Sequence, residues 1–170
     1  MKKVALCLLF LGYFISVSAQ FQWVEIGISG LTCSACSRSV EMSLRKVTFI
    51  DSIHMNLENT NAKVFFKNDS IVEIEKIAQA VIDAGFSVSY LKAGFIFNNV
   101  SISNNYCFSF ENNNYQFLVS DSKTLNGKII VRFIGDKYLS KKELRPWKSK
   151  MNKACVSDKT KKKSVYYITL

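Results

Sequence analysis

The order of apolar patterns across residues 22–90 constrains the fold of this chain more than any other feature. Apolar and polar residues alternate in four short segments, a period that predicts half-buried β-strands near residues 23–28, 52–57, 62–66 and 86–90. Helical spacing of apolar residues predicts one helix after the first strand and another after the third. The order βαββαβ is the ferredoxin-like pattern, in which two helices cover one face of a four-stranded antiparallel sheet. We therefore predict an α+β fold.

The second predicted helix carries the clearest signals at its ends. Ser70 and Glu73 stand at the spacing of a capping box, so we expect the helix to begin at Ser70. Gly85 is expected to end it, because glycine readily adopts the left-handed conformation that follows a helix. The apolar stripe between these ends consists of Ile71, Ile74, Ile77, Ala78, Val81 and Ile82.

The rest of the chain differs in composition, and we expect a domain boundary between residues 20–92 and 93–170. Segments rich in Phe and Tyr alternate with Asn-rich stretches, which is typical of short strands joined by turns. Asn126-Gly127 predicts a tight turn, and Glu143 stands at the capping-box position after Ser140. This order of elements suggests a small β-rich domain, a five-stranded barrel resembling an OB fold. The alternative is a β extension packed on the first domain.

Residues 1–19 have the features of an export signal. Met1-Lys2-Lys3 is basic, residues 4–15 are mostly apolar, and Val17-Ser18-Ala19 has the small-residue pattern of a cleavage site. The apolar run is shorter than a membrane span requires. We therefore expect a signal peptide and a mature chain that begins at Gln20 in the periplasm or is otherwise secreted. An uncleaved membrane anchor is the alternative.

Four cysteines remain after the predicted signal peptide: Cys33, Cys36, Cys107 and Cys155. An exported compartment is oxidising, so disulfides are permitted there. Cys33 with Cys36 and Cys107 with Cys155 are two candidate pairs. The sequence alone does not choose among the pairings.

Positive charge is concentrated in the last third of the chain. Residues 120–170 hold fourteen Lys and Arg against four Asp and Glu, whereas residues 20–95 hold seven against eight. A basic segment often binds nucleic acid, but export argues against that partner here. A solvated basic surface is the simplest interpretation. An acidic partner protein, such as a metal transporter, or an anionic membrane surface is the functional alternative.

The segment Cys33-Ser34-Ala35-Cys36 lies where a predicted loop runs into a predicted helix. Both sulfurs can then turn toward one metal ion. The free N–H groups at the start of the helix lower the pKa of the thiols and so favour the thiolate form. Thiolates select soft ions. A closed zinc site needs about four ligands, and His54 is expected to face outward from a strand. The pattern favours an open two-coordinate site for Cu(I). Hg(II) fits the same geometry, and Zn(II) is a third candidate.

The segment Gly30-Leu31-Thr32-Cys33-Ser34-Ala35-Cys36 resembles the Gly-Met-Thr-Cys-x-x-Cys motif of the heavy-metal-associated domain family of copper chaperones and metal-ATPase N-termini. Ala84-Gly85-Phe86 resembles the family's Ala-Gly-Tyr/Phe, and the resemblance covers residues 22–91. It implies that Cys33 and Cys36 are the metal ligands. It also implies that Leu31 is buried under the loop and that Phe86 shields the site. The family's turn glycine is missing near Phe49.

These observations lead to one leading hypothesis and two alternatives. The leading hypothesis is an exported carrier of Cu(I) or a similar ion, which uses Cys33 and Cys36 and passes the ion to a partner. A thiol–disulfide redox protein with the same cysteines is the first alternative, and an interaction module without metal is the second. We expect no enzyme and no small-molecule substrate, because no Ser-His-Asp or Cys-His pattern and no Gly-rich phosphate loop stands in the sequence.

Overall fold

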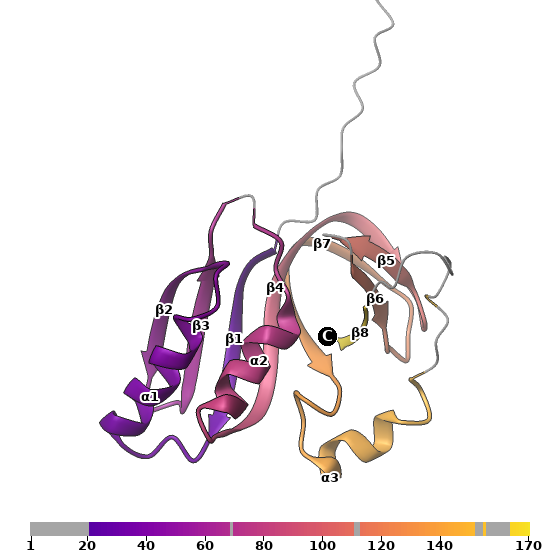
Figure 1. The fold of residues 1–170 in the computed structure, drawn as a ribbon. Helices are drawn as coiled ribbons and strands as arrows, with labels where there is room; N and C mark the ends of the chain where they lie inside the picture. Colours follow the sequence, from indigo (N-terminus) through magenta and orange to yellow (C-terminus); the bar gives the residue numbers. More distant parts are fainter. Residues whose placement is uncertain (1–20, 69, 111–112, 152–154, 156–163) are drawn as a thin grey trace, which may run out of the picture.

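A computed structural model describes residues 21–68, 70–110, 113–151, 155 and 164–170 (Figure 1). One eight-stranded sheet runs through this part of the chain, in the order β2-β3-β1-β4-β7-β8-β6-β5. The elements in chain order are β1 (Phe21–Ser29), α1 (Ser34–Leu44), β2 (Ile50–Asn56), β3 (Asn61–Phe66), α2 (Ile74–Asp83), β4 (Ser87–Ile102), β5 (Cys107–Phe110), β6 (Asn113–Phe117), β7 (Lys123–Ile134), α3 (Lys141–Leu144), the 3-10 helix η1 (Arg145–Trp147) and β8 (Val165–Thr169).

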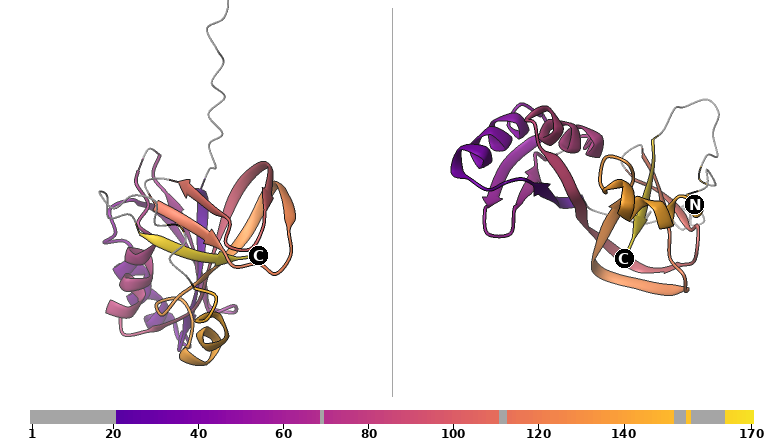
Figure 2. Two further views of the ribbon diagram at one scale, coloured as in Figure 1. Left: turned by 90° about the vertical axis from the view of Figure 1, so that its right-hand side faces the viewer. Right: turned by 90° about the horizontal axis from the view of Figure 1, so that it is seen from below.

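The first six elements confirm the predicted βαββαβ order. Strands β2, β3, β1 and β4 lie side by side and pair antiparallel, and α1 and α2 cover one face of them (Figure 2). Every second side chain of these strands points toward the helices, and together these side chains form the apolar layer beneath them. Its fully buried members include Val24, Ile26, Ile28, Ala62 and Val64. The N-terminal half is therefore ferredoxin-like, as the sequence predicts.

Helix α2 begins later than the sequence predicts. Instead of capping the helix, the Ser70 hydroxyl donates a hydrogen bond to the backbone oxygen of Lys67, at 2.7 Å. Such local side-chain bonds compete with helix formation. Glu73 becomes the N-cap residue without a side-chain cap bond, and Ile71 stays 66% exposed outside the helix. The predicted helix end is confirmed, because Gly85 follows it at φ +88°.

We expect Gly85→Ala to lower the free energy of unfolding by about 1 kcal/mol, because an L side chain is strained at positive φ. A β-carbon at Gly85 meets no atom within 4 Å, so the cost is conformational and not a clash. Urea unfolding measures it. Gly85→Asn is the matched control, since Asn tolerates the left-handed conformation and should cost less. Equal losses in the two variants would contradict this explanation.

Strand β4 belongs to both halves of the molecule. From Ser87 to Phe95 it pairs with β1, and from Lys92 to Ile102 it pairs with β7. The boundary expected between residues 92 and 93 therefore falls inside this strand. One hydrophobic cluster continues across it and includes buried side chains from both halves.

A second contact between the halves lies at the start of α2. Lys137 Nζ is 3.3 Å from the Glu75 carboxylate. Tyr138 and Tyr166 are buried nearby, and burial raises the pKa of both phenols, that of Tyr166 to about 12. Both phenols therefore stay neutral at physiological pH and act as core residues that join α2 to the C-terminal half.

The C-terminal half is β-rich, and its part of the sheet is strongly curved (Figure 2). Aromatic rings pack inside the curve. Strands β6 and β8 pair in parallel, whereas β5–β6 and β7–β8 pair antiparallel. The Phe108 ring on β5 lies 5.9 Å from the Phe95 ring and 5.7 Å from the Phe97 ring, both on β4. Among the described residues no ladder joins β5 to β4. The OB-like barrel therefore stays a prediction.

The prediction of a tight turn at Asn126-Gly127 is wrong, because these residues lie inside β7. The β4–β7 register shifts between Phe97 and Val100, with Asn99 at φ +53° and Gly127 at φ +78°. An extra residue in one strand forms a β-bulge, which bends the ribbon without ending it. Asn99 and Gly127 take the positive φ values at this bulge.

The capping box predicted at Ser140 is confirmed at the start of the short helix α3. The Ser140 hydroxyl accepts the Glu143 N–H at 3.3 Å, and the Glu143 carboxylate accepts the Ser140 N–H at 3.2 Å. Hydrogen bonds from the Ser140 hydroxyl and backbone, and then from Arg132, lower the pKa of Glu143. The helix then tightens into η1, which contains Pro146.

Candidate metal centre

The loop that carries Cys33 joins β1 to α1. Gly30 takes φ +87°, so the chain can turn at once after the strand. Leu31 is only 1% exposed and anchors the loop in the core, as the family resemblance implies. The Thr32 N–H donates to the Gly30 oxygen at 3.0 Å and closes a tight turn. The sequence therefore fixes both ends of the loop and leaves its tip in solvent.

Cys33 is the N-cap residue of α1 and Cys36 lies in its first turn. The Cys33 sulfur accepts the Cys36 N–H at 3.1 Å, which is the bond that a capping side chain makes. Cys33 is exposed and Cys36 is partly buried. The two sulfurs are joined in a disulfide, with Cα atoms 5.1 Å apart. On reduction, the same N–H and the positive end of the helix dipole would stabilise a thiolate at Cys33.

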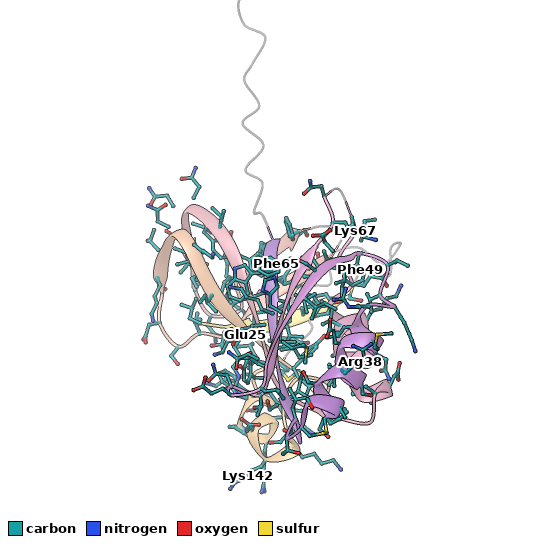
Figure 3. All side chains as sticks on the ribbon, turned by 90° about the vertical axis from the view of Figure 1, so that its left-hand side faces the viewer. Glu25, Arg38, Phe49, Phe65, Lys67 and Lys142 are labelled. Carbon is teal, nitrogen blue, oxygen red and sulfur yellow. A yellow bond between two sulfur atoms is a disulfide. The ribbon has the colours of Figure 1, made fainter. Side chains whose placement is uncertain are left out.

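Phe86 lies beside the cysteine loop, where the family resemblance puts it. A methyl group on Gly30 would lie 3.9 Å from Cδ1 of the Phe86 ring. Phe49, near the position where the family has its turn glycine, is 5% exposed and packs on Phe66. Lys67 Nζ donates to the Thr48 oxygen at 2.7 Å next to it. The turn after α1 is thus held by packing and a hydrogen bond. Phe49 and Lys67 are labelled in Figure 3.

Within the part of the chain that the structure describes, the fold brings no third ligand to these cysteines. Among the described residues, no group of three or more His, Cys, Asp or Glu side chains could hold a metal ion. His54 is exposed on β2, and its ring lies 5.4 Å from that of Phe65. Its strand partner Lys63 alternates with the helix-facing Ala62, so His54 lies on the sheet face away from the helices.

The second candidate cysteine pair also forms a disulfide. Cys107 lies on the edge strand β5 and is bonded to Cys155, with Cα atoms 5.7 Å apart. Cys155 is 6% exposed. This pair lies in the C-terminal half, whereas the cysteine loop lies in the N-terminal half.

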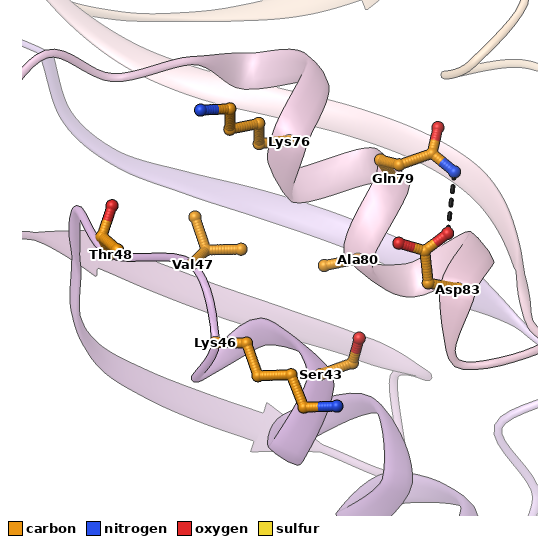
Figure 4. A pocket seen from close by; sticks show the side chains of 8 residues that line it. All are labelled: Ser43, Lys46, Val47, Thr48, Lys76, Gln79, Ala80 and Asp83. Carbon is orange, nitrogen blue, oxygen red and sulfur yellow. Dashed lines mark hydrogen bonds between the residues drawn. The ribbon is translucent and has the colours of Figure 1, made fainter.

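A hollow between the two helices is a feature that sequence reasoning missed. It has a volume of about 290 Å³ and lies between the end of α1 and the face of α2 (Figure 4). Gln79 donates to the Asp83 carboxylate at 2.9 Å on one wall. The lining residues are Ser43, Lys46, Val47, Thr48, Lys76, Gln79, Ala80 and Asp83. No sequence motif marks this set, because its members come from α1, the turn after it and α2.

Known proteins resemble the N-terminal half. The heavy-metal-associated domain model matches residues 25–87. The mercuric transport protein periplasmic component of Serratia marcescens is 32% identical over 92 residues, which span 54% of this chain and 100% of that protein. This chain belongs to the heavy-metal-associated domain family. A copper-transporting ATPase of Arabidopsis thaliana is 37% identical over 68 residues, but the match spans only 7% of its length.

Solved structures of the family match the same half of the chain. The CopZ metallochaperone is 29% identical, with 39% of this chain and 97% of that one covered and a TM-score of 0.37. Oxidized MerP from Ralstonia metallidurans is 30% identical, with 41% and 96% covered and a TM-score of 0.37. In the part of the chain that the structure describes, no helix is long and apolar enough to cross a membrane.

Proposed function

We propose that this protein carries a soft metal ion through Cys33 and Cys36. The observation that carries the proposal is the position of the two sulfurs, adjacent at the start of α1 with one of them in solvent. Reduction of the disulfide would give two thiolates at the mouth of a short, fixed loop. Such a pair can take up an ion and release it to a partner thiol without unfolding.

Cu(I) is the ion that we propose first, followed by Hg(II) and then Zn(II). Two thiolates satisfy a soft ion of linear geometry, whereas a structural zinc site needs about four ligands. The names of the relatives mention both mercuric and copper transport, which supports the first two candidates.

We propose that the protein works outside the cytoplasm and delivers the ion to a metal transporter. The name of a relative as a periplasmic component supports the location. The proposed signal peptide, residues 1–19, lies outside the described residues. We further propose that residues 20–92 are the metal-binding part and that residues 93–170 are an accessory part that contacts an acidic partner or membrane surface.

A titration of the reduced protein with Cu(I) against a competing chelator tests metal binding. We expect one ion per chain for the wild type and loss of that binding in Cys33→Ser and in Cys36→Ser, because a single thiolate cannot complete a two-coordinate site. The control is the Cys107→Ser/Cys155→Ser double variant, which should keep the wild-type stoichiometry. Unchanged binding in Cys33→Ser would reject the proposal, and the same series with Hg(II) ranks the two ions.

A thiol–disulfide redox role is the second candidate, and the disulfide at the site favours it. An insulin-reduction assay with dithiothreitol separates it from metal transport. A carrier should give no more turnover than the Cys36→Ser variant gives. Turnover that depends on Cys36, in a protein that fails to retain Cu(I), would replace the carrier by an oxidoreductase.

A further inference from the structure

The sheet face opposite α1 and α2 carries a cluster of lysines on aromatic rings. We name it the lysine–tryptophan face and define it by Trp23 on β1, Lys63 on β3, Tyr90 and Lys92 on β4, and Lys128 on β7. The register places these strands side by side in the order β3-β1-β4-β7. The helices lie on the other side of the sheet (Figures 2 and 3). This face is therefore separate from the cysteine loop.

Trp23 is the centre of the cluster. Lys63 Nζ lies 4.4 Å from the centre of its ring and Lys128 Nζ lies 5.5 Å from it. Lys92 Nζ lies 4.7 Å from the ring of Tyr90. Cation–π contacts hold an ammonium group in place without neutralising its charge. Each lysine thus stays available to an anion.

The indole nitrogen of Trp23 gives a second, independent observation. Trp23 is 7% exposed, and its Nε1 is buried with no hydrogen-bond partner among the residues that the structure describes. A buried N–H without an acceptor is costly, so it favours a ligand that supplies one. The indole edge rests on Gly94, where a β-carbon would lie 3.1 Å from Nε1. The Nζ atom of Lys128 lies over the ring, so binding at the indole requires this side chain to change rotamer.

The charges on this face are not balanced within the described part of the chain. None of Lys63, Lys92 and Lys128 forms an ion pair there. The Glu25 carboxylate, which stands opposite Lys63 and Lys92 in the register and accepts the Tyr90 hydroxyl at 2.9 Å, offsets one of the three positive charges. Beside the lysines, Ile130 is 52% exposed on β7. The face therefore offers three cations, an unpaired N–H donor and an apolar rim.

We propose that the lysine–tryptophan face binds an acidic peptide segment of a partner protein. One carboxylate of the segment pairs with Lys63 and Lys128 and accepts the Trp23 indole N–H, and a second pairs with Lys92. In an extended peptide every second side chain points to the same side, as in the strands of the sheet. Two carboxylates of the segment can therefore face the lysines together. A membrane surface fits less well, because interfacial anchors are exposed aromatic side chains, whereas Trp23 is covered.

Isothermal titration calorimetry with a 12-residue peptide of alternating Asp and Ser tests the proposal, and the Asn–Ser peptide is the ligand control. We expect binding of the acidic peptide alone, at least tenfold weaker in the Lys63→Gln/Lys128→Gln variant. The matched control is Lys141→Gln/Lys142→Gln, which removes the same charge from exposed positions at α3 and should change the affinity less than twofold. Trp23→Phe keeps the ring but removes the N–H, and should also weaken binding.

Three results would overturn the proposal: no binding of the acidic peptide, an equal loss in both double-lysine variants, or binding only to vesicles of phosphatidylglycerol. An equal loss would mean that net charge, and not this face, attracts the peptide. Cys33→Ser should bind the peptide like the wild type. Failure of peptide binding and failure of metal binding are therefore distinguishable.

Discussion

Replacement of Cys107 and Cys155 by serine is expected to lower the free energy of unfolding by about 4 kcal/mol. The two residues are 48 positions apart in the sequence, and their disulfide closes that long loop in the unfolded chain. In the chain-entropy model a loop of this length restricts the unfolded state by about that amount. The bond also ties the edge strand β5, which pairs with β6 alone among the described strands, to Cys155.

Urea unfolding under non-reducing conditions measures this loss. The control is the Cys33→Ser/Cys36→Ser double variant, whose disulfide spans only 3 positions. The same relation gives a loss of no more than about 2 kcal/mol for so short a loop. Equal losses in the two variants would show that the long loop does not determine the stabilisation.

Phe95→Ala is expected to cost about 3–5 kcal/mol, the range for removal of a large ring from a packed core. Phe95 is fully buried, and four aromatic rings lie with centroids 5.4–6.0 Å from its own. Its backbone lies where β4 passes from its pairing with β1 to its pairing with β7. The cavity would therefore weaken the aromatic core at the junction of the two halves.

The two tryptophans provide the measurement, since Trp23 lies in the N-terminal half and Trp147 in the C-terminal half. In each experiment one tryptophan is changed to phenylalanine and the fluorescence of the other is followed. We expect both tryptophans to report the same unfolding transition, with and without the Phe95→Ala substitution. Phe65→Ala, on the partly exposed sheet face, is the control and should cost less. Separate transitions for the two tryptophans would mean that the halves unfold independently.

The N-terminal fold could be predicted from the sequence because its signals are local. Alternation in each strand and the glycine after α2 depend on residues within a few positions of one another. The start of α2 could not, because Ser70 satisfies its hydroxyl in the preceding turn instead of capping the helix. Likewise Asn126-Gly127 has the composition of a tight turn. It is part of a bulge only because β7 pairs with β4, a distant contact that local sequence does not reveal.

The same distinction between local and distant signals applies to the sites. The adjacency of Cys33 and Cys36 follows from their spacing, so the candidate metal centre could be located from the sequence. The pairing of Cys107 with Cys155 depends on tertiary structure, and the sequence left it open. The lysine–tryptophan face comes from four strands, and its members meet only through sheet register.

The sharing of β4 between the two ladders has a mechanical consequence. Two domains on a flexible linker would sample a wide range of relative orientations, whereas a single strand that pairs with β1 along its first part and with β7 along its second restricts them. A macromolecule that binds the C-terminal half would therefore meet the cysteine loop at a fixed distance and orientation. Insertion of two residues into β4 should then change that distance and orientation and leave the cysteine loop itself unaltered.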